Sequence, residues 1–131
     1  MSQKKVLVVD DEIHIVHVVA IKLRNNGYEV ISANNGSEAY ELACEIMPDI
    51  IVTDYQMPVM TGMELVEKLR ENVQTKDIPV IMLTARSFAI SKEQQEQLQI
   101  SDCLSKPFSP RELLVNIEDI LYQKELVSEH K

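Results

Sequence analysis

Acidic, hydroxyl and lysine side chains stand at the ends of short apolar runs in this sequence. Asp10 and Asp11 follow one such run, Asp54 follows another, and Thr84 and Lys106 stand after two more. Carboxylates that converge repel one another, and a divalent cation relieves that repulsion. Oxygen ligands without histidine or cysteine suit a hard ion, Mg²⁺ or Mn²⁺. With a lysine and a hydroxyl to stabilise an added anion, this set of groups suits phosphoryl transfer to a carboxylate nucleophile.

Asp54 is the carboxylate that we expect to act as the nucleophile, because it stands alone whereas Asp10 and Asp11 form a pair. Each group alone has an ordinary structural interpretation. An Asp-Asp pair after a strand often caps a helix, and a single Asp often occupies a turn. The joint placement of acids, hydroxyl and lysine at four strand ends favours the functional interpretation.

Five apolar runs alternate with segments of helical periodicity, which predicts five strands and five helices. The expected strands are Lys5–Val9, Tyr28–Ser32, Asp49–Thr53, Pro79–Leu83 and 102–104. The expected helices are Glu12–Asn26, one that Ser37 caps and that ends before Pro48, one that Thr61 caps, Ser91–Gln99, and one from Ser109-Pro110 to about Gln123. This alternation predicts an α/β, flavodoxin-like (βα)5 three-layer sandwich with a parallel sheet in the order 2-1-3-4-5. The carboxyl ends of parallel strands share one edge of the sheet, so the polar groups should meet there.

Length and charge narrow the classes of protein. The chain has 131 residues, 21 acidic and 13 basic, for a net charge of −8. We expect one domain over 1–131, with a core of about 4–123 and a short polar tail at 124–131. The acidic balance argues against direct binding of nucleic acid or of anionic membrane surfaces. No apolar run approaches the roughly 20 residues of a membrane-spanning helix, so we expect a cytoplasmic protein without membrane insertion.

Glycines and cysteines exclude further classes. Three glycines leave no dinucleotide-binding fingerprint and no P-loop. The two cysteines, Cys44 and Cys103, lie in unrelated contexts. We therefore expect free thiols rather than a zinc site or a disulfide framework.

Four pieces of the sequence together resemble the receiver domain of two-component response regulators, over about 4–122. They are VLVVDDE at 6–12, DYQMP at 54–58 with Gly62, LTA at 83–85 and KPF at 106–108. The resemblance implies that Asp54 accepts a phosphoryl group from a histidine kinase or a histidine phosphotransfer protein. It implies a signalling domain that catalyses only its own phosphorylation and dephosphorylation. Its output would be altered binding of a downstream protein target, or action on an effector domain missing from this sequence.

The resemblance also implies roles for single residues around the metal. Asp11 would bind Mg²⁺ directly, and Asp10 would bind through water or position the site. Gln56 would offer its backbone carbonyl to the ion, next to Asp54. Thr84 would be the switch hydroxyl that turns to the phosphoryl oxygen.

Other implied roles concern the switch and its timing. Lys106 would pair with the phosphoryl group, and its bond to Pro107 would be cis. Receivers usually carry Tyr or Phe where this chain has Cys103: either a small side chain simply fills the strand, or the switch does not use the usual aromatic swing.

Gln56 and Arg86 stand where family members vary and are candidates for tuning the phosphoaspartate lifetime. Arg86 either covers the phosphoryl group or is a solvated charge.

The first helix is more apolar than a one-sided helix requires. Either it has a broad buried face, or part of it forms a docking patch for the helical bundle of the kinase. Ile15 and Val18 are the docking candidates.

Two alternatives belong to other classes. A haloacid-dehalogenase-type phosphatase needs a D-x-D pair at the first strand, which the DDEI sequence at 10–13 lacks. A pseudo-receiver acts as a scaffold without phosphorylation and usually lacks one of the acids or the lysine, all of which are present here. The sequence leaves open whether the chain is a stand-alone regulator or a receiver cut from a longer one.

Overall fold

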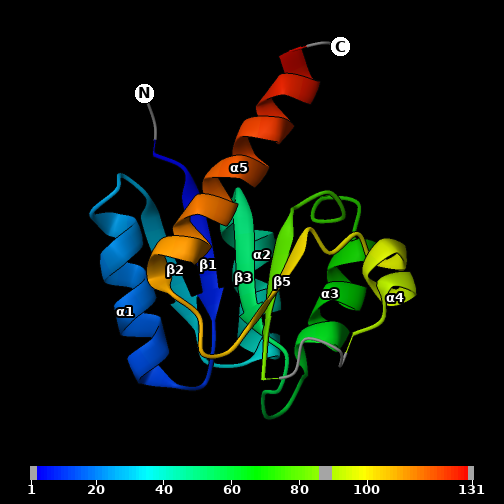
Figure 1. Ribbon diagram of the computed structural model, residues 1–131. Helices are drawn as coiled ribbons and strands as arrows, with labels where there is room; N and C mark the ends of the chain where they lie inside the picture. Colours follow the sequence, from blue (N-terminus) through cyan, green and yellow to red (C-terminus); the bar gives the residue numbers. More distant parts are fainter. Residues whose placement is uncertain (1–2, 86–89, 130–131) are drawn as a thin grey trace.

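Strands and helices alternate along the chain in the computed structural model, which describes residues 3–85 and 90–129 (Figure 1). The described strands are β1 Lys5–Val9, β2 Glu29–Ala33, β3 Ile50–Asp54, β4 Val80–Thr84 and β5 Asp102–Ser105. The described helices are α1 Ile13–Arg24, α2 Gly36–Ile46, α3 Gly62–Glu71, α4 Lys92–Gln97 and α5 Pro110–Glu129. None of these helices is both long and apolar enough to cross a membrane.

The strands form one parallel sheet in the order β2-β1-β3-β4-β5, which confirms the predicted topology. β3 and β4 are buried along their whole length, as strands covered on both faces should be. In the register, Val9 of β1 pairs with Thr53 of β3, and Asp54 pairs with Leu83 of β4. The carboxyl ends of β1, β3 and β4 therefore lie side by side.

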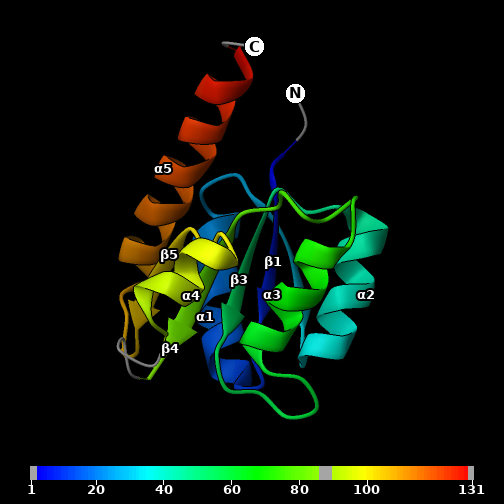
Figure 2. The same cartoon turned by 90° about the vertical axis from the view of Figure 1, so that its right-hand side faces the viewer.

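Helices cover the two faces of the sheet in separate layers, with α1 and α5 on one face and α2, α3 and α4 on the other (Figures 1 and 2). Successive side chains of a strand point to opposite faces. Val6 and Val8 of β1 accordingly pack under α1 and α5, whereas Leu7 and Val9 pack under α2 and α3. The two cores hold the strand ends rigidly in place.

The residue that caps α2 differs from the sequence prediction. Asn35, not Ser37, is the N-cap: its side chain accepts a hydrogen bond from the backbone N–H of Glu38 at 2.9 Å. Asn is as good a cap as Ser, so a start at Asn35 has no capping disadvantage over a start at Ser37. Gly36 also permits the early start, because a Cβ there would lie 2.8 Å from the Cβ of Met60.

Helix α5 is longer than predicted and continues beyond Gln123 to Glu129, so most of the predicted polar tail is helical. The cause is composition, because no glycine or proline follows Pro110 to stop the helix. An ion pair of 3.4 Å between Lys4 and Glu125 also ties the extension to the start of β1. The last turns project past the sheet (Figure 1).

Helix α4 is short and has no buried residue of its own, yet its end is firmly held. Arg70 of α3 donates from Nε to the carbonyl of Leu98 at 2.7 Å and from a terminal nitrogen to that of Gln99 at 3.1 Å. The other terminal nitrogen donates to the carbonyls of Lys76 and Ile78 at 2.9 and 2.8 Å. One guanidinium thus joins the end of α4 to the loop that precedes β4.

Candidate functional site

Three aspartates meet at the carboxyl edge of the sheet. Asp10 and Asp11 follow β1, and Asp54 is the last residue of β3. One carboxylate oxygen from each of the three lies within 4.8 Å of the others. Asp10 and Asp54 are buried, whereas Asp11 is exposed, so the cluster opens to solvent on one side.

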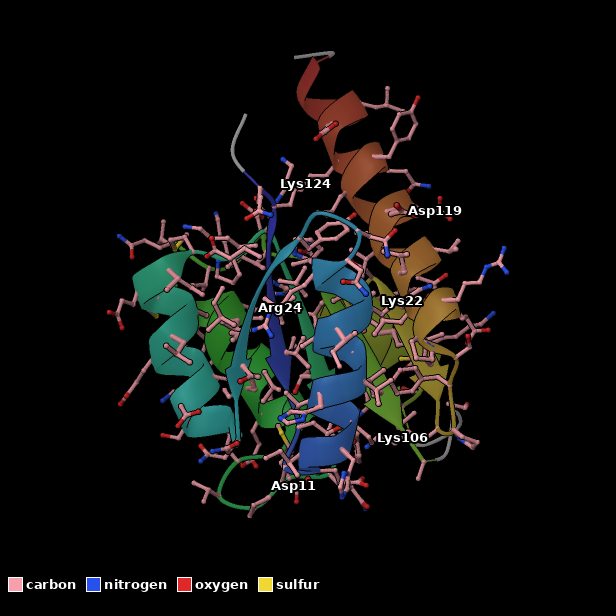
Figure 3. All side chains as sticks on the ribbon, turned by 90° about the vertical axis from the view of Figure 1, so that its left-hand side faces the viewer. Asp11, Lys22, Arg24, Lys106, Asp119 and Lys124 are labelled. Atoms are coloured by element: carbon pink, nitrogen blue, oxygen red, sulfur yellow. The ribbon has the colours of Figure 1, made fainter. Side chains whose placement is uncertain are left out.

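Lys106 follows β5 and sends its ammonium into this cluster. Its Nζ lies 3.1 Å from Asp10 Oδ2, 3.2 Å from Asp54 Oδ1 and 3.3 Å from Glu12 Oε1. An ammonium has three hydrogens, so each can go to one carboxylate. Figure 3 shows Asp11 and Lys106 at the same end of the molecule, away from Asp119 and Lys124 on α5.

The charges at the site are unbalanced. Burial, together with the negative charge of Asp10, raises the pKa of Asp54 to about 6, and the charge of Lys106 only partly opposes the rise. Burial also raises the pKa of Asp10, although the backbone N–H of Glu12 and the side chain of Lys106 work against it. Burial alone would lower the pKa of Lys106, but its bonds to Asp10 and Asp54 outweigh burial and raise it.

A divalent cation fits this donor set. Lys106 supplies one positive charge against the three aspartates, and the clustered groups are all oxygen donors. Such a set suits Mg²⁺ or Mn²⁺, which bind through carboxylates and carbonyls and retain some water. Because Asp11 is exposed, the donor set can be reached from solvent.

Gly62 allows helix α3 to begin directly against the acidic cluster. Its N–H donates to the carbonyl of Tyr55 at 2.9 Å. A Cβ at this position would collide with the carbonyl oxygen of Asp54 and lie 2.8 Å from the sulfur of Met82. The loop between β3 and α3 therefore keeps its path only with glycine here, and it carries Gln56 exposed beside Asp54.

Thr84 ends β4, and Lys106 directly follows the neighbouring strand β5. Thr84 is the last residue of β4 and is buried, and its backbone carbonyl accepts a hydrogen bond from the N–H of Lys106 at 2.8 Å. The Lys106–Pro107 peptide bond is cis. Arg86, a predicted tuning residue, lies outside the described residues.

Cys103 lies in β5 opposite Met82 of β4 and packs, partly buried, against the core beneath α2 and α3. Burial, and then the charge of Asp102, raise the pKa of its thiol. Cys44 and Cys103 are both free cysteines. The structure thus places a small, partly buried thiol at this position of β5.

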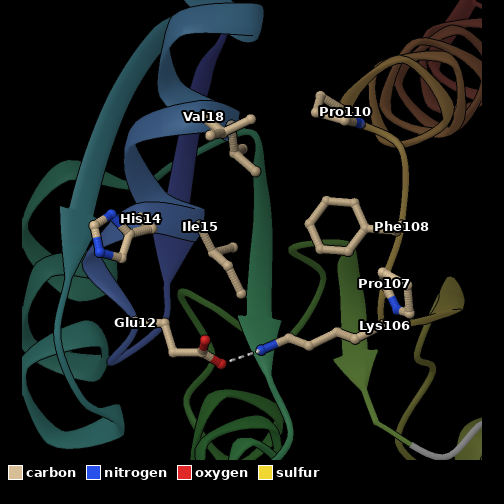
Figure 4. Close-up of a pocket in the computed structure, with 9 residues that line it drawn as sticks. Glu12, His14, Ile15, Val18, Lys106, Pro107, Phe108 and Pro110 are labelled. Atoms are coloured by element: carbon tan, nitrogen blue, oxygen red, sulfur yellow. Dashed lines mark hydrogen bonds and ion pairs between the residues drawn. The ribbon is translucent and has the colours of Figure 1, made fainter.

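An apolar groove of about 520 Å³ adjoins the acidic cluster between α1 and the start of α5 (Figure 4). Ile15 and Val18 line one wall, and Pro107 and Phe108 line the other. Both predicted docking residues therefore face the groove. The interpretation of α1 as a broadly buried helix fails for Val18, which is 52% exposed.

Sequence reasoning placed the aspartates and Lys106 together, but it missed Glu12. The side chain of Glu12 reaches Lys106 from the N-cap of α1, and its backbone N–H donates to Asp10 Oδ1 at 2.9 Å. Its position directly after Asp11 was the available clue.

Comparison with known proteins gives a consistent result. The family model of the response regulator receiver domain matches residues 6–118. The phosphate regulon transcriptional regulatory protein PhoB of Pseudomonas aeruginosa is 38% identical over 121 residues, which are 92% of this chain and 53% of that protein. The alkaline phosphatase synthesis transcriptional regulatory protein PhoP of Bacillus subtilis is 39% identical over 125 residues, which are 95% of this chain and 51% of that protein. The chain thus spans about half the length of these curated relatives.

A solved structure agrees with the fold. The chemotaxis response regulator CheY4 of Vibrio cholerae superposes with a TM-score of 0.83 at 38% identity. The match covers 91% of this chain and 99% of that one.

The raised pKa of Asp54 predicts how stability depends on pH. Ionised Asp54 destabilises the folded, metal-free protein. This penalty is largest above the folded pKa of about 6, and it fades as the pH falls from about 6 toward the ordinary value of 3.8. We expect Asp54→Asn to raise the free energy of unfolding by about 1 kcal/mol or more at pH 8 and by less at pH 4.5. Urea unfolding with a chelator measures both values. Asp119→Asn is the control, because Asp119 is exposed on α5. If the free energy of unfolding depended on pH equally in the two variants, the prediction would be contradicted.

Proposed function

This chain belongs to the response regulator receiver domain family, and from that premise we propose that it accepts a phosphoryl group on Asp54 and thereby changes partner binding. One observation carries the proposal. The carboxylates of Asp10, Asp11 and Asp54 converge within 4.8 Å, and the ammonium of Lys106 lies 3.2 Å from Asp54. Few structural needs explain so costly an arrangement of like charges.

Asp10, Asp11, Asp54 and the backbone carbonyl of Gln56 would hold Mg²⁺ or Mn²⁺. The chemistry that a bound ion supplies is neutralisation of negative charge on the incoming phosphoryl group. A carboxylate oxygen of Asp54 attacks the phosphorus, so an oxygen–phosphorus bond forms while the bond from phosphorus to the donor histidine breaks. Lys106 stabilises charge on a phosphoryl oxygen from its place beside Asp54.

β4 and β5 transmit the effect of phosphorylation away from Asp54. The Thr84 hydroxyl turns toward the phosphoryl oxygen at the end of β4, while Lys106 pairs with it at the end of β5. Because Thr84 and Lys106 are also joined through their backbones at 2.8 Å, both strand ends respond to the same added charge. The loops that lead to α4 and α5 begin there.

The partners follow from the family. A histidine kinase or a histidine phosphotransfer protein supplies the phosphoryl group. A downstream protein, or an effector domain outside this sequence, receives the response. We propose one receiver domain over 1–131, located in the cytoplasm, with no direct contact to nucleic acid because its net charge is −8.

Labelling with a small phosphodonor tests the function. We expect acetyl phosphate with Mg²⁺ to add one phosphoryl group, detected by intact mass, and Asp54→Asn to abolish the addition. Asp11→Asn should slow labelling at least about tenfold, because a metal ligand is lost. A chelator should stop labelling of the unaltered protein, and Asp119→Asn should be labelled normally.

Other outcomes of the same experiment favour the alternative classes. Labelling that persists in Asp54→Asn contradicts the proposal that Asp54 is the acceptor. Labelling that never occurs contradicts the proposal and favours a scaffold. Steady release of inorganic phosphate from added phosphomonoesters favours a phosphatase.

The apolar groove beside the acidic cluster is the proposed docking site for the kinase, through Ile15 and Val18. We expect Ile15→Ala and Val18→Ala each to slow phosphotransfer from a histidine kinase about five- to tenfold, because an apolar contact is lost. Labelling by acetyl phosphate should not change. Ile21→Ala is the matched control, since Ile21 is exposed on the same helix but does not line the groove. Equal effects of Ile15→Ala with both donors would contradict docking.

Gln56 and Arg86 are proposed to tune the lifetime of the phosphoaspartate.

The output switch is proposed to work without an aromatic swing at Cys103. We expect Cys103→Tyr to change the affinity for the downstream partner at least about twofold and to alter its dependence on phosphorylation, because a ring must repack this strand. Cys103→Ala should leave both nearly unchanged. Titration of the partner against labelled and unlabelled protein measures the effect, and an unchanged Cys103→Tyr variant would show that position 103 plays no part.

A further inference from the structure

Glu12 forms an ion pair with Lys106 that lies between the acidic cluster and the apolar groove. Its Oε1 lies 3.3 Å from Lys106 Nζ, and the Glu12 side chain is 61% exposed. Both residues line the groove, and their ion pair bridges it from α1 to the segment before α5 (Figure 4). A donor protein that approaches Asp54 along the groove therefore meets this pair.

Glu12 differs in role from the other two carboxylates that share the ammonium. Asp10 and Asp54 belong to the proposed metal site, so a bound cation would compete with Lys106 for their charge. Glu12 is the remaining partner of Lys106 among the described residues, and its hold would persist when a cation binds. In the metal-free protein three carboxylates share the three ammonium hydrogens, so a phosphoryl oxygen competes with them for Lys106.

Glu12 contacts the cluster in two separable ways. Its backbone N–H holds Asp10 at 2.9 Å, and its side chain holds Lys106 at 3.3 Å. Side-chain substitutions at Glu12 therefore leave the backbone contact to Asp10 in place and change the contact to Lys106. The Glu12 charge also raises the pKa of Asp10, so a variant that keeps the charge is needed beside one that removes it.

We propose that Glu12 is a positioning residue that restrains Lys106 in the resting protein and so slows phosphorylation of Asp54. The ammonium lies 3.2 Å from Asp54 and 3.3 Å from Glu12, so Glu12 engages one of the hydrogens that a phosphoryl oxygen on Asp54 would need. This inference rests on the proposed phosphorylation of Asp54.

Two substitutions separate the ion pair from charge alone. Glu12→Gln removes the charge and keeps the length, whereas Glu12→Asp keeps the charge but is one methylene shorter and should not reach Lys106. We expect the maximal rate of Asp54 labelling, at saturating acetyl phosphate and Mg²⁺, to rise about two- to fivefold in both variants, the range expected of an ion pair with one exposed partner. Glu93→Gln controls for net charge and should label at the original rate.

The ¹⁵N resonance of the Lys106 ammonium in metal-free protein gives a second readout that does not depend on labelling. It should shift, with faster hydrogen exchange, in Glu12→Gln and Glu12→Asp but not in Glu93→Gln. Unchanged or slower labelling in both Glu12 variants would overturn the proposal, as would an unchanged Lys106 resonance. A rise in Glu12→Gln alone would also overturn it, because charge and not contact would then be the cause. If unaltered protein is not labelled on Asp54, the proposed function fails, and the resonance alone then decides whether Glu12 restrains Lys106.

Discussion

Repulsion among Asp10, Asp11 and Asp54 is the constraint on which the rest of the structure depends. Their carboxylates lie within 4.8 Å, and a single ammonium cannot neutralise them. The chain accepts this cost because β1 and β3 are anchored in two apolar cores, one on each face of the sheet. The burial that makes the strands rigid also raises the pKa of Asp54, so the fold and the reactivity of the site have the same origin.

The strand ends could be predicted from the sequence because one rule governs them: neighbouring parallel strands finish at one edge. Asp54 and Lys106 meet for that reason, although many residues separate them. The cap at Asn35 could not be predicted, since the start of α2 depends on how Gly36 packs against Met60. The contact of Glu12 with Lys106 could not be predicted either. It depends on how far one side chain reaches in the folded protein, and the periodicity of the sequence carries no information about that.

The acidic cluster and the apolar groove are continuous, and Lys106 belongs to both. If a donor protein docks as proposed, the groove offers it apolar area and the open side of the cluster offers a path to Asp54. The ion pair of Glu12 with Lys106 stands where the two needs meet. The proposed docking surface and the proposed reaction site therefore adjoin at Glu12 and Lys106, whereas Ile15 and Val18 belong to the groove alone.

Arg70 has a consequence for how such a domain diversifies. It holds the end of α4 through the backbone carbonyls of Leu98 and Gln99, and every residue type has a carbonyl. Exposed side chains of α4 can therefore be replaced without loss of the anchor. Such replacements would change what this surface can contact without moving the end of the helix from its place beside α3.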